Sequence, residues 1–188
     1  MELHDAIRTR RSVRVFQSTP VARPLIEGII ADATYAPSRW NLQPWRFHVA
    51  TGAALARVAD VVALTTVHLE EYLKARHPEA IETAVRFHAN LGGAPVAIAV
   101  SAPIVEGRLD VQSEALAIGS AVQNLLLSAV DHGLAACCIA APEWIRGSFA
   151  DVFGVPEGSE IIVLIAVGIA AEEPPCEPRA ADAVTFLA

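Results

Sequence analysis

Four of the chain's fourteen basic residues lie within the seven-residue stretch Arg8–Arg14, although the protein carries a formal net charge of −7. The last five positions of this stretch supply three guanidinium groups and one hydroxyl, from Arg10, Arg11, Arg14 and Ser12. Guanidinium groups form paired hydrogen bonds with phosphates, so the stretch suits a small dianion such as a phosphate monoester. A solvated, arginine-rich helix end is the alternative that the stretch alone leaves open.

A second polar segment follows at residues 36–45, with the sequence Ala-Pro-Ser-Arg-Trp-Asn-Leu-Gln-Pro-Trp. Its two prolines, together with Ser38 and Asn41, predict a loop over 37–44. The amide side chains of Asn41 and Gln43 match the polar edge of a uracil-like ring, or alternatively they cap the loop itself. The two segments together indicate a phosphate-bearing cofactor with a polar ring system, which a flavin mononucleotide (FMN) fits.

Motifs of several other enzyme classes do not occur in the sequence. There is no Gly-x-x-x-x-Gly-Lys phosphate loop, no Gly-x-Gly-x-x-Gly and no Gly-x-Ser-x-Gly. The six histidines and the cysteines at 137, 138 and 176 lack the spacing of metal ligands or of a disulfide framework. We therefore expect no metal site, and we expect a cofactor to supply the chemistry. Cys137 and Cys138 are predicted to be buried thiols of an apolar strand.

The segments that must position these residues alternate between helices and apolar strands. We expect strands at 46–51, 95–102, 134–141 and 160–170, and an extended or strand-like tail at 180–187. Helices are expected at 2–9, at 24–33, over most of 53–91, and at 111–132 and 143–153. This alternation predicts an α+β sandwich with a central sheet. No repeat or linker divides the sequence, so we expect one domain over residues 1–188.

The overall composition bears on partners and location. Hydrophobic residues make up 53% of the chain and the mean hydropathy is +0.40, which predicts an oligomer that buries apolar surface between subunits. The longest uninterrupted apolar stretch, at 161–171, is shorter than the ~20 residues of a membrane span, so no membrane partner is expected. A pI of about 5.3 argues against nucleic acid. The acidic N-terminus and unpaired cysteines favour the cytoplasm.

Four blocks of the sequence, in order, resemble the nitroreductase family of FMN-dependent flavoproteins. Residues 6–16 resemble its opening Arg-Arg-Ser-x-Arg-x-Phe signature, and residues 36–47 match its more specific Ala-Pro-Ser-x-x-Asn-x-Gln-Pro-Trp motif. Residues 121–134 are similar to its central helix, and residues 179–186 resemble its C-terminal phosphate arm. The resemblance covers almost the whole chain. It implies a mostly antiparallel central sheet flanked by helices, in an interlocked homodimer.

The resemblance also implies roles for single residues. The FMN phosphate and ribityl chain would be held by Arg10, Arg11, Ser12, Arg14 and Arg179. The same flavin would be contacted from the other subunit by Pro37, Ser38, Arg39 and Asn41. Gln43 would fix that loop or reach the flavin edge. The isoalloxazine ring would lie near N5 against the backbone of Ile139, Ala140 and Ala141, where an N–H donor is favourable.

The activity that the resemblance implies is a ping-pong transfer of two electrons from NAD(P)H through FMN to a nitroaromatic, a quinone or a similar small oxidised acceptor. Two alternatives remain open from the sequence: a flavin dehydrogenase with a peptide-derived substrate, and a flavin-binding protein without turnover. The chain departs from the family at Ala140, where glycine is frequent, and at Glu177, where a basic residue is frequent. Arg11 or Arg14 would compensate for the cation missing at Glu177.

Overall fold

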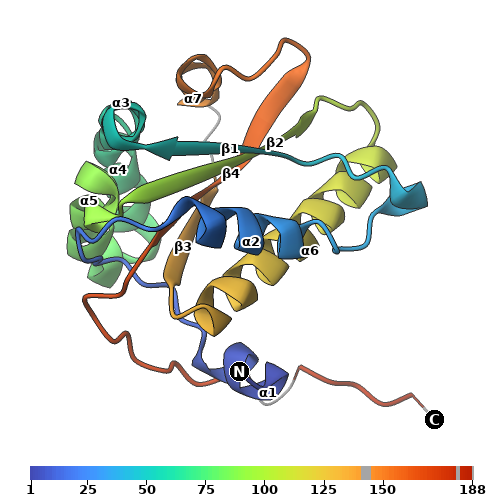
Figure 1. Ribbon diagram of the computed structural model, residues 1–188, viewed down its shortest axis with the longest axis horizontal. Coiled ribbons are helices and arrows are strands. Elements are labelled where there is room, and N and C mark those ends of the chain that lie inside the picture. Colours follow the sequence, from blue (N-terminus) through green and yellow to red (C-terminus); the bar gives the residue numbers. More distant parts are fainter. Residues whose placement is uncertain (141–144, 181–182, 188) are drawn as a thin grey trace.

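The computed structural model describes residues 1–140, 145–180 and 183–187, and a four-stranded sheet lies at its centre (Figure 1). The strands are β1 (Arg46–Thr51), β2 (Val96–Pro103), β3 (Ala135–Ala140) and β4 (Ser159–Gly168), and their order in the sheet is β1-β2-β4-β3. Every pair of neighbours is antiparallel. The predicted α+β fold with an antiparallel central sheet is therefore confirmed.

Helices cover both faces of the sheet, as expected for a sheet whose central strands are apolar on both sides. On one face lie α2 (Arg23–Ala33) and α6 (Arg108–Asp131), which pack on Val96, Ile98 and Val100 of β2. The other face packs under α3 (Gly52–Ala63), α5 (Ile81–Asn90) and α7 (Arg146–Phe153). In addition, α4 (Thr66–Arg76) packs on α5, and α1 (Leu3–Thr9) lies beside α6 (Figure 1).

Helix α6 begins at Arg108, three residues earlier than predicted, after Gly107 with a φ of 96°. A turn into the helix at positive φ is favourable only for glycine, which explains the boundary. By length and composition α6 could cross a membrane. Its inward residues, from Ala117 to Ala129, instead pack on the sheet and on α2 as in the core helix of a globular protein. Leu109, Val111 and Leu116 on its outer side are exposed in the single chain.

The cysteines of β3 differ from the prediction. Cys137 is buried, but Cys138 is exposed, so the expectation of two buried thiols is wrong for Cys138. Successive side chains of a strand point to opposite faces, and only the face of Cys137 is covered at this point of the sheet. Burial raises the pKa of Cys137 to about 11, which keeps its thiol protonated at neutral pH.

Two boundaries near the C-terminus also differ from the prediction. The helix expected at 143–153 is observed as α7 from Arg146, while residues 143 and 144 lie outside the described part. The tail was expected to be extended or strand-like at 180–187. Its described residues, 180 and 183–187, belong to no helix or strand.

Candidate functional site

The basic segment that follows α1 runs along the outer edge of β3. Ser12 forms a parallel β-bridge with Ala136, and the backbone N–H of Val13 donates to the Ala136 carbonyl at 3.3 Å. This pairing places the segment beside the strand that carries Ile139 and Ala140. The structure therefore brings the predicted phosphate residues and the predicted ring contacts to one strand. The third predicted ring contact, Ala141, lies outside the described residues.

Close contacts between backbones fix where the basic segment lies. The N–H of Phe16 donates to the Gly92 carbonyl at 2.9 Å. Gly92 has a φ of 64°, and a Cβ built there would lie 2.0 Å from the carbonyl oxygen of Arg14. The buried Phe16 ring is in turn packed against Gly168, where a Cβ would lie 3.2 Å from it. The segment can follow this path only because Gly92 has no side chain.

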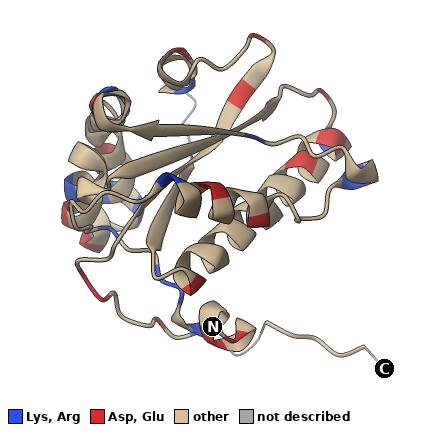
Figure 2. Ribbon diagram, viewed as in Figure 1, with Lys and Arg blue, Asp and Glu red and all other residues tan. Residues whose placement is uncertain are grey.

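Within the described part of the chain, the guanidinium groups of the segment form hydrogen bonds with carbonyl oxygens and none with a carboxylate. The guanidinium of Arg11 donates to the carbonyls of Arg8 and Arg10 at 2.6 and 2.8 Å, and Arg14 donates to the Ser12 carbonyl at 3.4 Å. Among the described residues, no ion pair involves any of the four arginines at 8, 10, 11 and 14. Figure 2 shows these basic positions at and after α1. Uncompensated guanidinium groups in an acidic protein are the donor set that a phosphate dianion needs.

The C-terminal tail passes directly beside this segment. The carboxylate of Glu172 accepts hydrogen bonds from the backbone N–H groups of Arg14 and Val15, at 2.5 and 3.1 Å. Further along, residues 173–176 line a hollow together with Thr9 and Arg11. Arg179 is exposed and forms no hydrogen bond or ion pair within the described residues. The tail thus carries Arg179 past the basic segment without fixing its side chain there.

The polar loop at 37–44 is confirmed as a loop with one short 3-10 turn, η1 (Arg39–Asn41). Its backbone is unusual, because Trp40, Asn41 and Gln43 all have positive φ. The hydroxyl of Ser38 accepts a hydrogen bond from the Gln43 N–H at 3.0 Å, which closes the loop. The backbone of Gln43 thus helps to close the loop, while the predicted role of its side chain stays a prediction.

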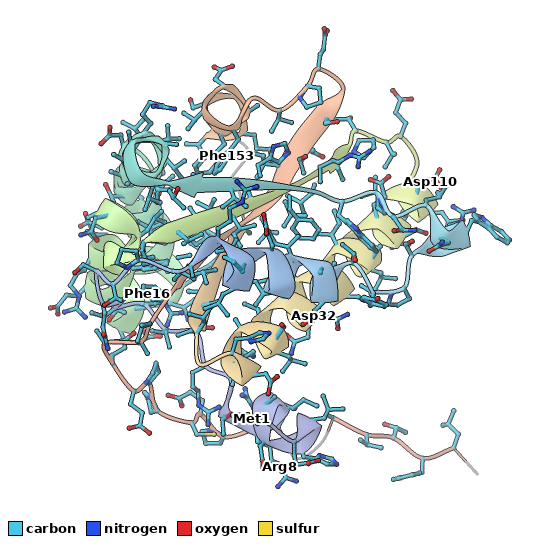
Figure 3. All side chains as sticks on the ribbon, in the orientation of Figure 1. Met1, Arg8, Phe16, Asp32, Asp110 and Phe153 are labelled. Carbon is cyan, nitrogen blue, oxygen red and sulfur yellow. The ribbon has the colours of Figure 1, made fainter. Side chains whose placement is uncertain are left out.

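The loop lies at the start of α6, where Arg39 forms an ion pair with Asp110. Pro37 and Ser38 also line a surface hollow with residues of the first half of this helix. The opposite end of α6, near Asp131, lies beside α1 and Met1. Figure 3 shows Asp110 at the upper right and Arg8 at the bottom, towards the two ends of α6.

A helix rises 1.5 Å per residue, so about 30 Å of α6 separates Asp110 from Asp131. Within one chain the structure therefore does not bring the predicted loop residues, from Pro37 to Gln43, to the basic segment. This separation agrees with the prediction that the loop serves a flavin bound mainly by another subunit. A shared site stays a prediction.

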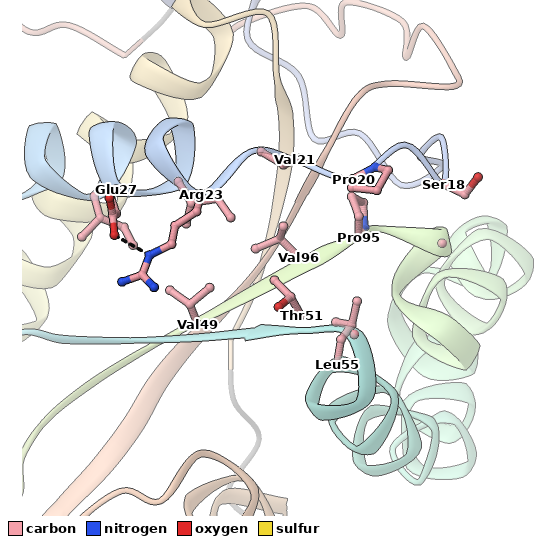
Figure 4. A pocket seen from close by; sticks show the side chains of 14 residues that line it. Ser18, Pro20, Val21, Arg23, Glu27, Val49, Thr51, Leu55, Pro95 and Val96 are labelled. Atoms are coloured by element: carbon pink, nitrogen blue, oxygen red, sulfur yellow. Dashed lines mark hydrogen bonds and ion pairs between the residues drawn. The ribbon is translucent and has the colours of Figure 1, made fainter.

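A cavity of about 890 Å³ lies elsewhere, between α2, the edge strand β1 and the start of α3 (Figure 4). Its wall is mostly apolar, with Val49 and Leu55 on one side. Arg23 and Glu27 of α2 form an ion pair at 2.7 Å on the other side. None of the predicted site residues lines this cavity.

Two partly buried histidines should make the stability depend on pH. Burial lowers the pKa of His48, whose Nε2 lies 2.8 Å from the Ser101 hydroxyl, and burial also lowers the pKa of His88, with Arg14 adding to the shift. The unfolded chain therefore binds protons more readily than the folded one. The free energy of unfolding should fall as the pH drops from about 6.5 towards the lowered pKa values.

Urea unfolding at pH 7.5 and at pH 5.5 measures this effect. A His48→Gln variant should lose less stability between the two pH values than the wild type does. The exposed His4 provides the control, since His4→Gln should leave the difference unchanged. An equal loss in the His48→Gln variant and the wild type would contradict the assignment to His48.

Comparisons of the sequence with known proteins identify one family. A sequence model of the nitroreductase family matches residues 7–169. A 4-nitrobenzoate reductase of Pseudomonas putida is 29% identical over 195 residues, covering 88% of this chain and 84% of that protein. A nitrobenzene nitroreductase of Ectopseudomonas oleovorans is 40% identical over 79 residues, which are 42% of this chain and 31% of that protein.

The fold also matches solved structures. The FMN and NADPH-dependent nitroreductase NfnB from Sphigopyxis sp. strain HMH superposes with a TM-score of 0.81 at 26% identity. The alignment covers 100% of both chains. The order of strands and helices described above is therefore that of a known flavoenzyme fold.

Proposed function

The chain belongs to the nitroreductase family, and on this premise we propose that it is an FMN-dependent oxidoreductase. It passes two electrons from NAD(P)H to a nitroaromatic, a quinone or a similar acceptor in a ping-pong cycle. One observation carries the proposal: the segment with Arg10, Arg11 and Arg14 pairs with the outer edge of β3, and no carboxylate of the described residues forms an ion pair with these guanidinium groups. The relatives named after nitroaromatic substrates support the choice of acceptor.

The residues present fit FMN. Guanidinium groups of Arg10, Arg11 and Arg14 and the hydroxyl of Ser12 would hold the phosphate and the ribityl chain, and Arg179 would close on the phosphate from the tail. Strand β3 is an edge strand of the sheet, and its outer edge pairs with the basic segment at Ala136. The backbone groups of Ala140 point to the same edge as those of Ala136 and would be free to face the flavin ring, whereas those of Ile139 point toward Leu164 of β4.

When bound, FMN would supply the redox chemistry, by accepting a hydride from the nicotinamide and giving two electrons to the acceptor. The protein's part is to hold the phosphate and orient the ring, so that donor and acceptor meet the same face in turn. The proposal needs no acidic or basic side chain, because water supplies the protons in an open pocket. The whole chain, residues 1–188, would act as one FMN-binding domain, and we propose the cytoplasm as its location.

The proposal includes a homodimer in which each flavin is shared. The loop that carries Ser38, Arg39 and Asn41 lies at the start of α6, whereas α1, which leads into the basic segment, lies beside the other end of this helix. A second subunit would bring the two parts together. The exposed apolar residues of α6, such as Leu109, Val111 and Leu116, would then be covered by the partner.

The absorbance spectrum of the purified protein tests the proposed function. We expect the spectrum of an oxidised flavin, which NADH or NADPH bleaches in a stopped-flow experiment and a nitroaromatic or quinone restores. Protein that is colourless and takes up no added FMN would contradict the flavin assignment. A bound flavin that no nicotinamide reduces would favour a dehydrogenase of another donor or a flavin-binding protein without turnover.

Mixing two damaged chains should restore flavin binding if the site is shared. One chain carries Arg10→Ala, and the other carries Ser38→Ala and Asn41→Ala. In the heterodimer, one site combines both defects, while the other combines two intact parts. We expect each parent to bind FMN poorly and the heterodimer to bind about half of the wild-type amount.

The mixing experiment requires differential tags, so that the heterodimer is isolated and its FMN content is measured alone. A mixture of each variant with itself is the control. If all FMN ligands came from one chain, every site in the heterodimer would stay damaged. No recovery in the isolated heterodimer would therefore reject the shared site and leave the flavin function standing.

A further inference from the structure

One carboxylate near the basic segment is bound in an unusual way. Oε1 of Glu172 accepts hydrogen bonds from two consecutive backbone N–H groups, those of Arg14 and Val15, at 2.5 and 3.1 Å. Two consecutive N–H groups that converge on one oxygen form a small anion-binding concavity. Hydrogen bonds to an ionised oxygen are stronger than those between neutral groups. Glu172 therefore ties the tail to the basic segment by a strong local contact.

This contact completes a longer pairing between the two segments. The N–H of Gln17 donates to the Ile169 carbonyl and the N–H of Ala171 donates to the Val15 carbonyl, both at 2.9 Å. The side chain of Gln17 donates to the Ala170 carbonyl at 3.0 Å. Glu172 is the last residue of this paired stretch, and beyond it the tail turns along Thr9 and Arg11.

The contact leaves the guanidinium groups available for a ligand. The Glu172 carboxylate accepts hydrogen bonds from backbone N–H groups. Within the described residues it forms no ion pair with the arginines of the segment. The charges of Arg10, Arg14 and Glu172 nevertheless all influence the pKa of the buried Cys137 thiol. Burial is the main cause of the raised pKa of this thiol, which Glu172 raises further and the two arginines lower.

We propose that Glu172 is a positioning residue of the anion site: it clips the tail that carries Arg179 onto the backbone of Arg14, and so brings cations of both segments to one phosphate. The inference rests on the proposed function only for the identity of the phosphate as that of FMN. The two hydrogen bonds that Glu172 accepts from Arg14 and Val15, here called the clip, do not depend on which ligand binds. Its effect on the ligand should therefore be specific to the phosphate group.

Binding of FMN and of riboflavin, which lacks the phosphate, tests the clip. We expect Glu172→Ala to weaken FMN binding to the protein at least tenfold in a fluorescence titration, while the affinity for riboflavin changes less than twofold. Glu173→Ala is the matched control, because Glu173 is exposed and forms no described hydrogen bond or ion pair. It removes the same charge one residue away, and its FMN affinity should stay within twofold of the wild type.

Hydrogen exchange of the flavin-free protein provides a second measurement. The amides of Arg14 and Val15 should exchange at least tenfold faster in the Glu172→Ala variant and at the wild-type rate in the Glu173→Ala variant. Glu172→Gln keeps an acceptor oxygen without the charge, so both effects should be intermediate. This variant also serves if Glu172→Ala does not fold.

Several results would overturn the inference. Unchanged exchange at Arg14 and Val15 would show that Glu172 does not hold the segment. An equal loss of FMN and riboflavin affinity in Glu172→Ala would assign Glu172 a general structural role. If Glu173→Ala lowered the FMN affinity as much as Glu172→Ala, the loss would come from the missing negative charge and not from the hydrogen bonds. If the wild-type protein bound neither flavin, the proposed function would fail, and the exchange rates would then decide on the clip separately.

Discussion

Replacing both Arg10 and Ser12 by alanine should lower the affinity for FMN about a hundredfold or more while the protein stays folded. Each replacement removes a hydrogen bond to an ionised phosphate, and such bonds contribute about 1.5–3 kcal/mol each. A loss of about 3 kcal/mol corresponds to roughly a hundredfold in affinity. The fold should persist, because the β-bridge of Ser12 to Ala136 uses the backbone and Arg10 has no described carboxylate partner.

A fluorescence titration of flavin-free protein with FMN measures this loss, and circular dichroism checks the fold. The control replaces a second arginine and serine pair, Arg23 and Ser18, which lie on the cavity of Figure 4 away from the predicted site. That variant should keep the wild-type affinity. If the Arg10→Ala/Ser12→Ala variant kept its full flavin complement after dialysis, the phosphate assignment would be wrong.

Replacing Gly92 by alanine should destabilise the fold by about 3 kcal/mol or more. The new Cβ would lie 2.0 Å from the carbonyl oxygen of Arg14, and a backbone group cannot rotate away as a side chain does. Overpacking of this kind costs about 1–3 kcal/mol, and the positive φ adds roughly 1 kcal/mol more. The segment must move, so the affinity for FMN should fall as well.

Gly93 provides a close control for this replacement. Its φ of 77° carries a similar backbone cost, but its nearest neighbour is the Phe16 carbonyl oxygen at 3.5 Å, an ordinary contact. Gly93→Ala should therefore lose only about 1 kcal/mol in urea unfolding, from the positive φ alone. Equal losses in the two variants would show that the contact with Arg14 is not the cause.

The sequence predicted those elements whose signals are local. Strand β1 was predicted with its observed bounds, 46–51, because polar and apolar residues alternate there just after the loop. The apolar face of α2, with Ile26, Ile29 and Ala33 buried, follows from helical spacing after Pro24. Helices were predicted over most of 53–91, and Pro78 explains why α4 ends at Arg76, because proline disfavours the helical conformation of the residue before it.

Features that depend on contacts between distant segments were not predictable. The run at 134–141 is apolar throughout, so the sequence does not reveal that one face of β3 is covered and the other, with Cys138, is exposed. The residues around Gly92 likewise do not reveal that its lack of a Cβ leaves room for the backbone of Arg14. Glu172 lies in a proline-rich tail, and no motif around it predicts that its carboxylate binds the backbone of Arg14 and Val15.

The candidate site was predictable in its parts and not in its assembly. The residue types at 10–14 and 37–43 indicated an anion and a polar ring edge, because such chemistry is visible in short motifs. Their places at opposite ends of α6 follow from the packing of α2 and α6, which no motif encodes. In the proposed dimer, the basic segment of one subunit and the loop of the other would together form the site.

The partners of the basic segment also determine when it acquires its structure during synthesis. Arg14 and Glu172 are 158 positions apart, and β4, which separates β2 from β3 in the sheet, is the last strand to leave the ribosome. At about 5–20 residues per second, roughly ten seconds or more pass between the synthesis of Arg14 and that of Glu172, which binds its backbone. Until then the apolar edge of β2 is unpaired, which makes the nascent chain most vulnerable to aggregation just before translation reaches β4.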